Sequence, residues 1–329
     1  MKFIYYSPEI LSETKISVDG IVPNSFHLSH WKGNQTPEVF TADTSTEIAI
    51  KFITHPHSEK YIQKCDILSN NHFDTDGLLA LWVLLSPSQA LPHKEFLIAA
   101  AEVGDFSQFT QPKAVQFNLL VTAFRESPES PFAETMREWR DEKKDQFCYE
   151  KLLEQLPLLL SNLSAYEKFW LSEYIKIENS FEQFEKGEVL RKEFPKESLT
   201  VLVCGKRPSK YAIDHHCQGN LFLIVQIHSE GFCYDLEYRY YSWAETITRP
   251  KIPQVPMEQL ASRLNVYDGR GLGRWMSQGF QGGSLTTALK YTNPEGDSLP
   301  SRFPYENVAQ MVRDYIRQAS AGQRSHPCQ

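Results

Sequence analysis

The segment from residue 66 to residue 85 constrains the fold more than any other part of the sequence. It begins with DILSN (66–70), which predicts a short strand that ends in polar residues. It ends with GLLALWVLL (77–85), which is apolar at nearly every position, so a helix formed here is buried on more than one side. A strand that leads through a polar turn into a buried helix is typical of an α/β sheet with helix-covered faces.

Neighbouring segments extend this pattern. Residues 38–43 (EVFTAD) predict a strand, and the capping residues 44–46 precede a predicted helix over 47–55. Residues 94–103 (KEFLIAAAEV) predict another helix, closed by Gly104. We therefore expect an α/β fold with a mainly parallel sheet and flanking helices.

The segment from 111 to 196 has a different character. It is dense in Glu, Lys, Arg and Asp from Ala133 onward. Large apolar residues recur in it at spacings of four and three: Trp170, Tyr174, Ile177, Phe181 and Phe184. This spacing places them on one helical face. We expect a helical insertion over 111–196, between a metal-motif half over 1–110 and a C-terminal part over 197–329.

The C-terminal part is rich in predicted strands, over 199–204 and 211–214. The β-rich runs 221–228 and 232–241 flank a short turn that contains glycine, which predicts a β-hairpin. Residues 305–317 predict a helix. We expect this part to be a smaller α+β structure.

Composition narrows the class of protein. The net charge is −7, from 34 basic and 41 acidic residues, which argues against a protein that coats nucleic acid. Six cysteines are scattered without a C-x-x-C pair, which fits a reducing compartment. The longest apolar run, 78–85, is far too short to span a membrane, and the first residues lack the pattern of a signal peptide. We expect a cytoplasmic protein with no membrane partner, and the sequence leaves the oligomeric state open.

One imidazole and two carboxylates, His72, Asp74 and Asp76, lie within five residues at the end of a predicted strand. Ligand sites in open α/β sheets lie beyond the carboxyl ends of strands. Such a nitrogen and oxygen set suits Mn²⁺, Mg²⁺ or Fe²⁺ better than structural zinc. A divalent ion also balances two carboxylates better than a helix N-terminus, which supplies only about half a charge. The alternative is an ordinary capped helix start.

A second acidic and imidazole group, Asp214, His215 and His216, also follows a predicted strand. One imidazole could bind a metal, the other could reach a substrate, and the acid could orient a ring. The alternative is a solvated loop end. Another pair, His27 and His30, is interpreted as ordinary loop histidines.

Together the two groups resemble the motifs of the DHH phosphoesterase superfamily. One common form of its first motif is a strand followed by H-x-D-x-D-G, here His72 to Gly77, and its name-giving motif is a strand followed by D-H-H, here Asp214 to His216. The resemblance implies a site with two metal ions, usually manganese, that hydrolyses phosphoester or phosphoanhydride bonds. It implies small phosphorylated substrates or short single-stranded nucleic acid. Over its whole length the chain is also similar to a family of uncharacterised proteins that share HFDTDG.

The resemblance also implies roles for individual residues. It assigns His72 and Asp74 to the first metal ion, and Asp76 and His215 to the second. His216 would contact the scissile phosphate, with Asp214 supporting the site as an outer or direct ligand. The superfamily has a further aspartate between the motifs, for which Asp105 is the candidate and Asp43 a rival. It also has a late aspartate ligand, for which Asp268 is the candidate.

A glycine-rich segment, 269–283, follows Asp268 and leads to further polar residues. Backbone amides and the hydroxyls of Ser284 and Thr286 could receive phosphate, with Arg270 or Arg274 as an anion clamp. The alternative is a set of tight turns that leads into a capped helix.

These observations favour a phosphohydrolase that depends on Mn²⁺ or Mg²⁺, with two ions. It would use metal-activated water on a nucleotide or a short oligonucleotide. One alternative is a non-catalytic protein that keeps this scaffold and binds a nucleotide or a partner. Another is a structural protein that uses the helical insertion as a docking surface.

Overall fold

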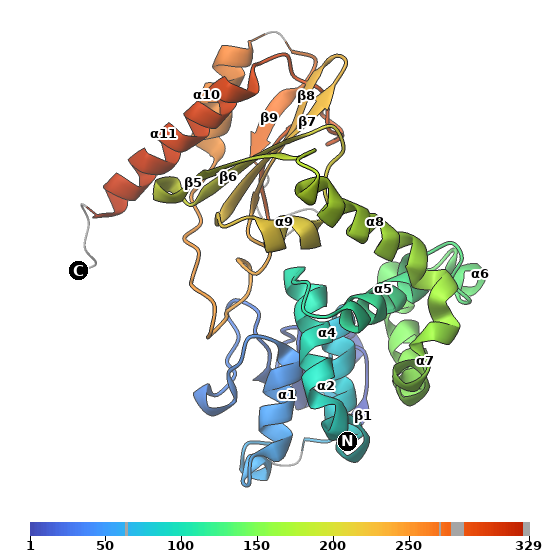
Figure 1. The fold of residues 1–329 in the computed structure, drawn as a ribbon. Helices are drawn as coiled ribbons and strands as arrows, with labels where there is room; N and C mark the ends of the chain where they lie inside the picture. Colours follow the sequence, from blue (N-terminus) through green and yellow to red (C-terminus); the bar gives the residue numbers. More distant parts are fainter. Residues whose placement is uncertain (63–64, 270, 278–285, 325–329) are drawn as a thin grey trace. The chain divides into compact units, whose positions relative to one another are not determined.

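The computed structural model describes residues 1–62, 65–269, 271–277 and 286–324, and the chain forms two compact units (Figure 1). The first unit contains residues 1–176 and 243–251, and the second contains 177–242 and 252–329. The expected α/β fold is confirmed, because a parallel sheet, a mixed sheet and many helices are present. The division into three parts stays a prediction.

The elements of the first unit are mostly helical. Its strands are β1 (Lys2–Phe3), β2 (Lys15–Val18), β3 (Ser25–Leu28) and β4 (Ile67–Ser69). Its helices are α1 (Ser45–Thr54), α2 (Thr75–Leu85), α3 (Pro87–Ala90), α4 (Lys94–Phe106), α5 (Pro112–Glu126), α6 (Ala133–Met136) and α7 (Asp141–Ser161), while α8 (Glu167–Glu185) crosses into the second unit. Short 3-10 turns are η1 (Pro8–Ile10), η2 (Glu38–Phe40), η3 (Ser58–Lys60), η4 (Leu91–His93) and η5 (Leu163–Tyr166).

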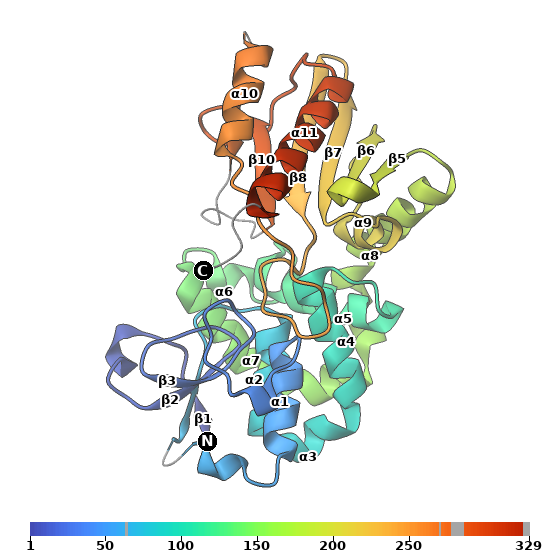
Figure 2. The same cartoon turned by 90° about the vertical axis from the view of Figure 1, so that its left-hand side faces the viewer.

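The sheet of the first unit is parallel, in the order β1-β4-β2-β3. Helices α1 and α2 pack against its strands, and α4 packs on both helices (Figure 2). Because all strands run the same way, β2, β3 and β4 deliver their following residues to the same edge. This edge is where the candidate site forms.

The three helices predicted near this edge are confirmed. The Thr44 side chain caps α1 by accepting a hydrogen bond from the Glu47 amide at 3.3 Å. Residues 75–84 of α2 are all buried, as the apolar sequence predicts. Helix α4 continues past Gly104 to Phe106. The strand predicted over 38–43 is wrong, because these residues form the short turn η2 and a loop.

The second unit contains a larger mixed sheet. Its strands are β5 (Leu190–Phe194), β6 (Leu199–Cys204), β7 (Leu221–His228), β8 (Gly231–Tyr238), β9 (Arg274–Ser277) and β10 (Thr287–Thr292), in the order β5-β6-β7-β8-β10-β9. Its other elements are η6 (Pro195–Glu197), α9 (Lys210–His216), α10 (Glu258–Asp268) and α11 (Tyr305–Arg324). The predicted hairpin is confirmed as the antiparallel pair β7–β8.

The two faces of this sheet bury different residues. On one face, side chains of β6 to β10 pack with α10 and α11, and on the other, Leu202 and Phe222 pack with Ile213 of α9. The strand predicted over 211–214 is wrong. The Ser209 side chain accepts a hydrogen bond from the Ala212 amide at 3.3 Å and starts helix α9 there instead.

None of the described helices is both long and apolar enough to cross a lipid bilayer.

Candidate metal centre

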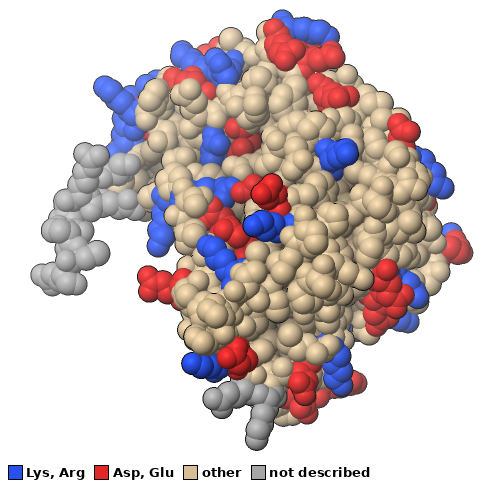
Figure 3. Space-filling view, turned by 60° about the horizontal axis from the view of Figure 1, so that its bottom comes forward, with Lys and Arg blue, Asp and Glu red and all other residues tan. Residues whose placement is uncertain are grey.

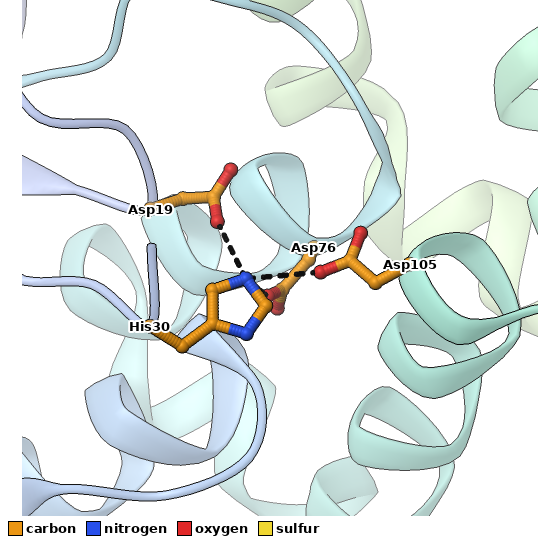
Figure 4. Close-up of side chains that lie close together, drawn as sticks. All are labelled: Asp19, His30, Asp76 and Asp105. Atoms are coloured by element: carbon orange, nitrogen blue, oxygen red, sulfur yellow. Dashed lines mark ion pairs between the residues drawn. The ribbon is translucent and has the colours of Figure 1, made fainter. Parts of the chain in front are cut away.

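Side chains from four elements of the first unit point toward one another at the edge of the parallel sheet (Figure 4). Asp19 directly follows β2, His30 follows β3, Asp76 lies in the first turn of α2, and Asp105 lies in the last turn of α4. The Nε2 atom of His30 lies 3.1 Å from Asp105 Oδ2, 3.5 Å from Asp19 Oδ1 and 3.6 Å from Asp76 Oδ2. One ligand atom from each residue lies within 4.8 Å of the others, and we call this group the inner cluster.

A second group adjoins the first and is open to solvent. The Nε2 atom of His72 lies 2.8 Å from Asp19 Oδ2 and 3.1 Å from Asp74 Oδ2. The side chains of His72 and Asp74 are 27% and 34% exposed, whereas that of Asp19 is fully buried. We call Asp19, His72 and Asp74 the outer cluster. Asp19 belongs to both clusters and faces each with a different carboxylate oxygen.

The tautomer of His30 follows from its other ring nitrogen. His30 Nδ1 lies 2.6 Å from the carbonyl oxygen of Asp43, which can only accept, so Nδ1 carries the proton. A neutral His30 therefore aims the lone pair of Nε2 at three carboxylates. Such an arrangement requires a positive charge at Nε2, which either a proton or a metal ion provides.

The N-terminus of α1 holds the carboxylate of Asp76. The backbone amide of Ser45 donates to Asp76 Oδ2 and that of Thr46 donates to Oδ1, both at 2.7 Å. The hydroxyl of Ser45 donates to Asp19 Oδ1 at 2.9 Å. Anions are stabilised at helix N-termini by free amides and the helix dipole. The start of α1 thus orients two carboxylates of the inner cluster.

A buried hydrogen-bond chain fixes the loops behind the clusters. Asn70 accepts from the Gly20 amide at 3.0 Å and donates to the Tyr149 hydroxyl at 2.8 Å. That hydroxyl donates to the carbonyl of His72 at 2.8 Å. The loops after β2 and β4 are therefore held by Asn70 and by a tyrosine of α7.

Among the residues that the structure describes, histidine is the only basic partner of the cluster carboxylates. Among the described residues, no lysine or arginine forms an ion pair with Asp19, Asp74, Asp76 or Asp105. Burial and the carboxylate of Asp19 raise the pKa of Asp76 to about 6. Burial and the carboxylate of Asp76 raise the pKa of Asp105 well above its ordinary value. Without a cation, these groups cannot all ionise together.

The imidazoles respond to the same field. Burial by itself lowers the pKa of His30, but Asp105, Asp19 and Asp76 outweigh burial and raise the pKa well above its ordinary value. For the acid Asp19, burial has the opposite sign and by itself raises the pKa. The nearby His72 and His30 outweigh burial and lower the pKa of Asp19. The negative field of the clusters therefore favours any bound positive charge.

The donor chemistry fits a divalent ion. Three buried atoms of the described clusters, Asp19 Oδ2, His30 Nε2 and Asp105 Oδ2, form no hydrogen bond of good geometry, although each lies close to another cluster side chain. Buried polar atoms normally have partners, so such atoms require an explanation. Ligand atoms of one ion at about 2.0–2.6 Å lie within about 5 Å of one another, as does one ligand atom from each residue of a cluster. Carboxylate and imidazole donors suit Mn²⁺ or Mg²⁺.

Comparison with known proteins places the chain in a family. A family model described as a family of unknown function (DUF6687) matches residues 1–327. The chain belongs to DUF6687. No curated protein matches it. A solved structure of a pGpG-specific phosphodiesterase, PggH from Vibrio cholerae, has a TM-score of 0.37 and 10% identity to this chain, over 95% of this chain and 90% of that one. A likeness at this level transfers no function.

The D-H-H motif of this DUF6687 chain lies in the second unit, on α9. Asp214 forms an ion pair with Arg239 at 2.9 Å. The ring of His216 stacks on Phe184 with centroids 4.6 Å apart, and His215 is exposed. Neither cluster of described residues includes these three side chains. Their roles at a metal site stay predictions.

The structure separates the candidate aspartates. Asp105 lies in the inner cluster. The carboxylate of Asp43 instead accepts hydrogen bonds from the 247–249 segment, including Arg249. Asp268 accepts from the indole nitrogen of Trp275 at 2.9 Å in the second unit. Of the expected aspartates, only Asp105 accompanies the H-x-D-x-D-G motif within the described residues.

The predicted phosphate-binding residues belong to the second unit. Arg274 is exposed at the start of β9, and Thr286 is buried just before β10. Arg270 and Ser284 lie outside the described residues. Their proposed contacts with phosphate stay predictions.

The sequence analysis missed Asp19, and it interpreted His30 as an ordinary loop histidine, whereas the structure places His30 in the inner cluster. Both follow four-residue strands, KISV and SFHL, that are too short for a clear alternation of polar and apolar residues. The available pattern was β-branched residues at alternate positions, Thr14, Ile16 and Val18, followed directly by Asp-Gly at 19–20. His30 comes to the site because β3 pairs in parallel with β2, with Leu28 opposite Val18, so that the residues after both strands lie side by side.

Proposed function

We propose that this chain is a divalent-metal-dependent phosphohydrolase that cleaves a phosphodiester or phosphoanhydride bond of a nucleotide or short oligonucleotide. The observation that carries the proposal is the convergence of four aspartates and two histidines with no lysine or arginine partner among the described residues. An unbalanced group of buried carboxylates is costly in a protein interior. Metal ions would neutralise these carboxylates, and all six side chains would then act as metal ligands.

The charges support two ions. Four ionised carboxylates carry four negative charges, which two divalent cations neutralise. Asp19, with one oxygen toward each cluster, supports one ion in each. The inner ion would be held by the inner cluster and the outer ion by the outer cluster. The expected ions are Mn²⁺ or Mg²⁺.

The two clusters differ in access, which suits hydrolysis. A pair of divalent ions lowers the pKa of water and stabilises the attacking and leaving oxygens of a phosphoryl displacement. His72 and Asp74 are partly exposed, so the substrate phosphate would approach from the outer cluster. The ring of Trp31 lies 5.0 Å from that of His72 and would offer a stacking surface for a nucleobase.

Surface charge and cysteine state agree with a small substrate and a reducing compartment. On the face displayed in Figure 3, acidic and basic side chains of the described residues are interspersed and form no continuous basic patch. Long nucleic acids require such a patch. Five cysteines of the described chain are unpaired, which agrees with the cytoplasmic location that belongs to this proposal.

Metal content tests the proposal first. We expect wild-type protein to bind about two Mn²⁺ ions, and the Asp19→Asn variant to lose both because Asp19 serves both clusters. Asp74→Asn should weaken only the outer ion. The control is Asp141→Asn, whose side chain is 76% exposed on α7. Metal per protein, measured by mass spectrometry and titration calorimetry, would contradict the proposal if wild type and Asp19→Asn bind equally little.

Turnover is measured next on bis-p-nitrophenyl phosphate, nucleoside diphosphates and dinucleotides. We expect Asp19→Asn to lower Mn²⁺-dependent turnover at least about 100-fold, in line with the loss of metal ligands. A His216→Ala variant tests the phosphate contact that the resemblance implies, which predicts lower turnover with unchanged metal content. Nucleotide binding without any turnover by wild type would favour the non-catalytic alternative.

A further inference from the structure

We infer that Arg249 is a positioning residue for the metal centre. Its side chain keeps His30 and Asp105, on two sides of the inner cluster, in fixed positions relative to each other. This inference rests on the proposed metal site. The chain leaves the second unit after Ser242, contributes residues 243–251 to the first unit, and returns to the second unit at Ile252. Arg249 lies near the end of this inserted segment.

One side of the guanidinium fixes the support of His30. Arg249 Nη1 forms an ion pair with Asp43 Oδ2. The amides of Ile247 and Thr248 donate to Asp43 Oδ1 at 2.5 Å and 3.0 Å. The carbonyl of the same Asp43 accepts from His30 Nδ1 at 2.6 Å. The position of Asp43 therefore sets the orientation of the His30 ring.

The other side of the guanidinium fixes the end of α4. Arg249 Nη2 lies 2.7 Å from Glu102 Oε1 and 2.6 Å from Gln108 Oε1. The guanidinium carbon lies 4.5 Å from the centroid of the Phe106 ring. These three residues flank Asp105, the ligand that α4 contributes to the inner cluster. One side chain thus links the supports of His30 and Asp105.

The same segment also contacts His30 directly. The amide of Glu245 donates to the carbonyl of His30 at 2.7 Å. The ring of Trp243 stands edge-on to the His30 ring, with centroids 5.1 Å apart. Backbone, ring and Nδ1 of His30 are therefore all held, directly or through Asp43, by residues 243–249.

Arginine suits this link better than lysine. Its planar fork directs one nitrogen toward Asp43 and another toward Glu102 and Gln108, whereas lysine offers all its donors on a single nitrogen. The Arg249 side chain is 11% exposed, so its ion pairs are little screened by solvent. Arg249→Lys keeps the positive charge but loses the fork, which separates geometry from charge.

Titration calorimetry with Mn²⁺ on the full-length protein gives the main test. Loss of a direct outer partner of a metal ligand weakens metal binding by about 10- to 100-fold. Arg249 acts one residue further out, through Asp43 and the end of α4, so we expect a loss near the lower limit, about 10-fold, in both Arg249→Lys and Arg249→Met. A role through charge alone predicts the opposite for Arg249→Met, because removing a nearby positive charge favours a bound cation. The control is Arg137→Met, which removes an exposed arginine paired with Glu134.

The visible spectrum of the Co²⁺-loaded protein, recorded at saturating Co²⁺, gives a second readout. We expect Arg249→Lys to change the band positions or intensities and Arg137→Met to leave them unchanged. Thermal unfolding in EDTA records the folding of each variant.

Two results would overturn the inference. One is a lower melting temperature with wild-type Mn²⁺ affinity and an unchanged Co²⁺ spectrum, which would show a merely structural role. The other is tighter Mn²⁺ binding by Arg249→Met. If wild type itself binds no Mn²⁺, the proposed function fails; if all variants bind like wild type, only this inference fails.

Discussion

Asp19 shows how one backbone conformation shapes the candidate centre. Its φ is 67°, in the left-handed region that aspartate tolerates better than most residues. The chain turns there directly after β2 and places the side chain between His30 and His72. The residue that both clusters share is therefore also the first residue after the strand.

Gly77 is required by close approach rather than by its own conformation. A Cβ atom there would lie 2.5 Å from the Tyr149 hydroxyl, 2.6 Å from Asn70 Nδ2 and 3.1 Å from Asp19 Oδ2. Exchange of glycine for alanine inside a helix ordinarily gains about 1 kcal/mol. Here we expect Gly77→Ala to lower the free energy of unfolding by about 1–3 kcal/mol, because the buried neighbours must shift.

Urea unfolding and Mn²⁺ titration check this prediction. The matched control is Gly205→Ala, since a Cβ atom at Gly205 meets nothing within 4 Å. We expect the control to change stability little and Gly77→Ala also to weaken Mn²⁺ binding through Asp19. A gain of stability in Gly77→Ala would contradict the packing argument.

At the scale of elements, the first turn of α1 serves both the helix and the site. Thr44 caps the helix, and the next two amides hold Asp76. Loss of a capping hydroxyl costs about 1 kcal/mol and frays the first turn. We expect Thr44→Ala to lower stability by about this amount and also to weaken Mn²⁺ binding several-fold.

Ser209 offers a matched comparison, because its side chain caps α9 of the second unit in the same way. Ser209→Ala should cost a similar stability, about 1 kcal/mol, and leave the Mn²⁺ affinity unchanged. Calorimetric titration of both variants separates the two effects. Equal Mn²⁺ affinities in both would show that the start of α1 does not support the centre.

For the whole molecule, the clusters make stability depend on pH. Burial and neighbouring carboxylates raise the pKa values of Asp76, to about 6, and of Asp105. Unfolded aspartate titrates near about 3.9, so the folded protein keeps protons that the unfolded chain has already released. These two carboxyl groups therefore contribute most to stability below about pH 3.9, and their contribution falls as pH rises through the folded pKa values.

We expect the contribution of Asp76 to the free energy of unfolding in EDTA to fall between about pH 4 and pH 6, by about 1.4 kcal/mol for each unit by which its pKa is raised. Saturating Mn²⁺ should reverse the fall, since the ion replaces the protons. Urea unfolding of wild type and Asp76→Asn across this range isolates the contribution of Asp76. A pH slope in EDTA that is identical in the two proteins would contradict the prediction.

Much of the first unit could be predicted because its strongest patterns are local. The apolar run at 77–85, the capping residues at 44–46 and the chemistry of His72, Asp74 and Asp76 lie in continuous stretches of sequence. The prediction of a strand over 211–214 was wrong because it relied on the β-prone residues Tyr211 and Ile213. The capping side chain of Ser209, which starts a helix there, is the stronger local signal.

The sequence by itself determined the α/β class, the buried helix α2 and the acidic and imidazole side chains at the start of that helix, because periodicity, capping and donor chemistry act between near neighbours. The tertiary structure alone decided which side chains join that turn. Asp19, His30 and Asp105 come from separate elements, and parallel pairing of short strands with packing of α4 brings them together. Such contacts depend on strand order and register, which spacing along a single chain does not record.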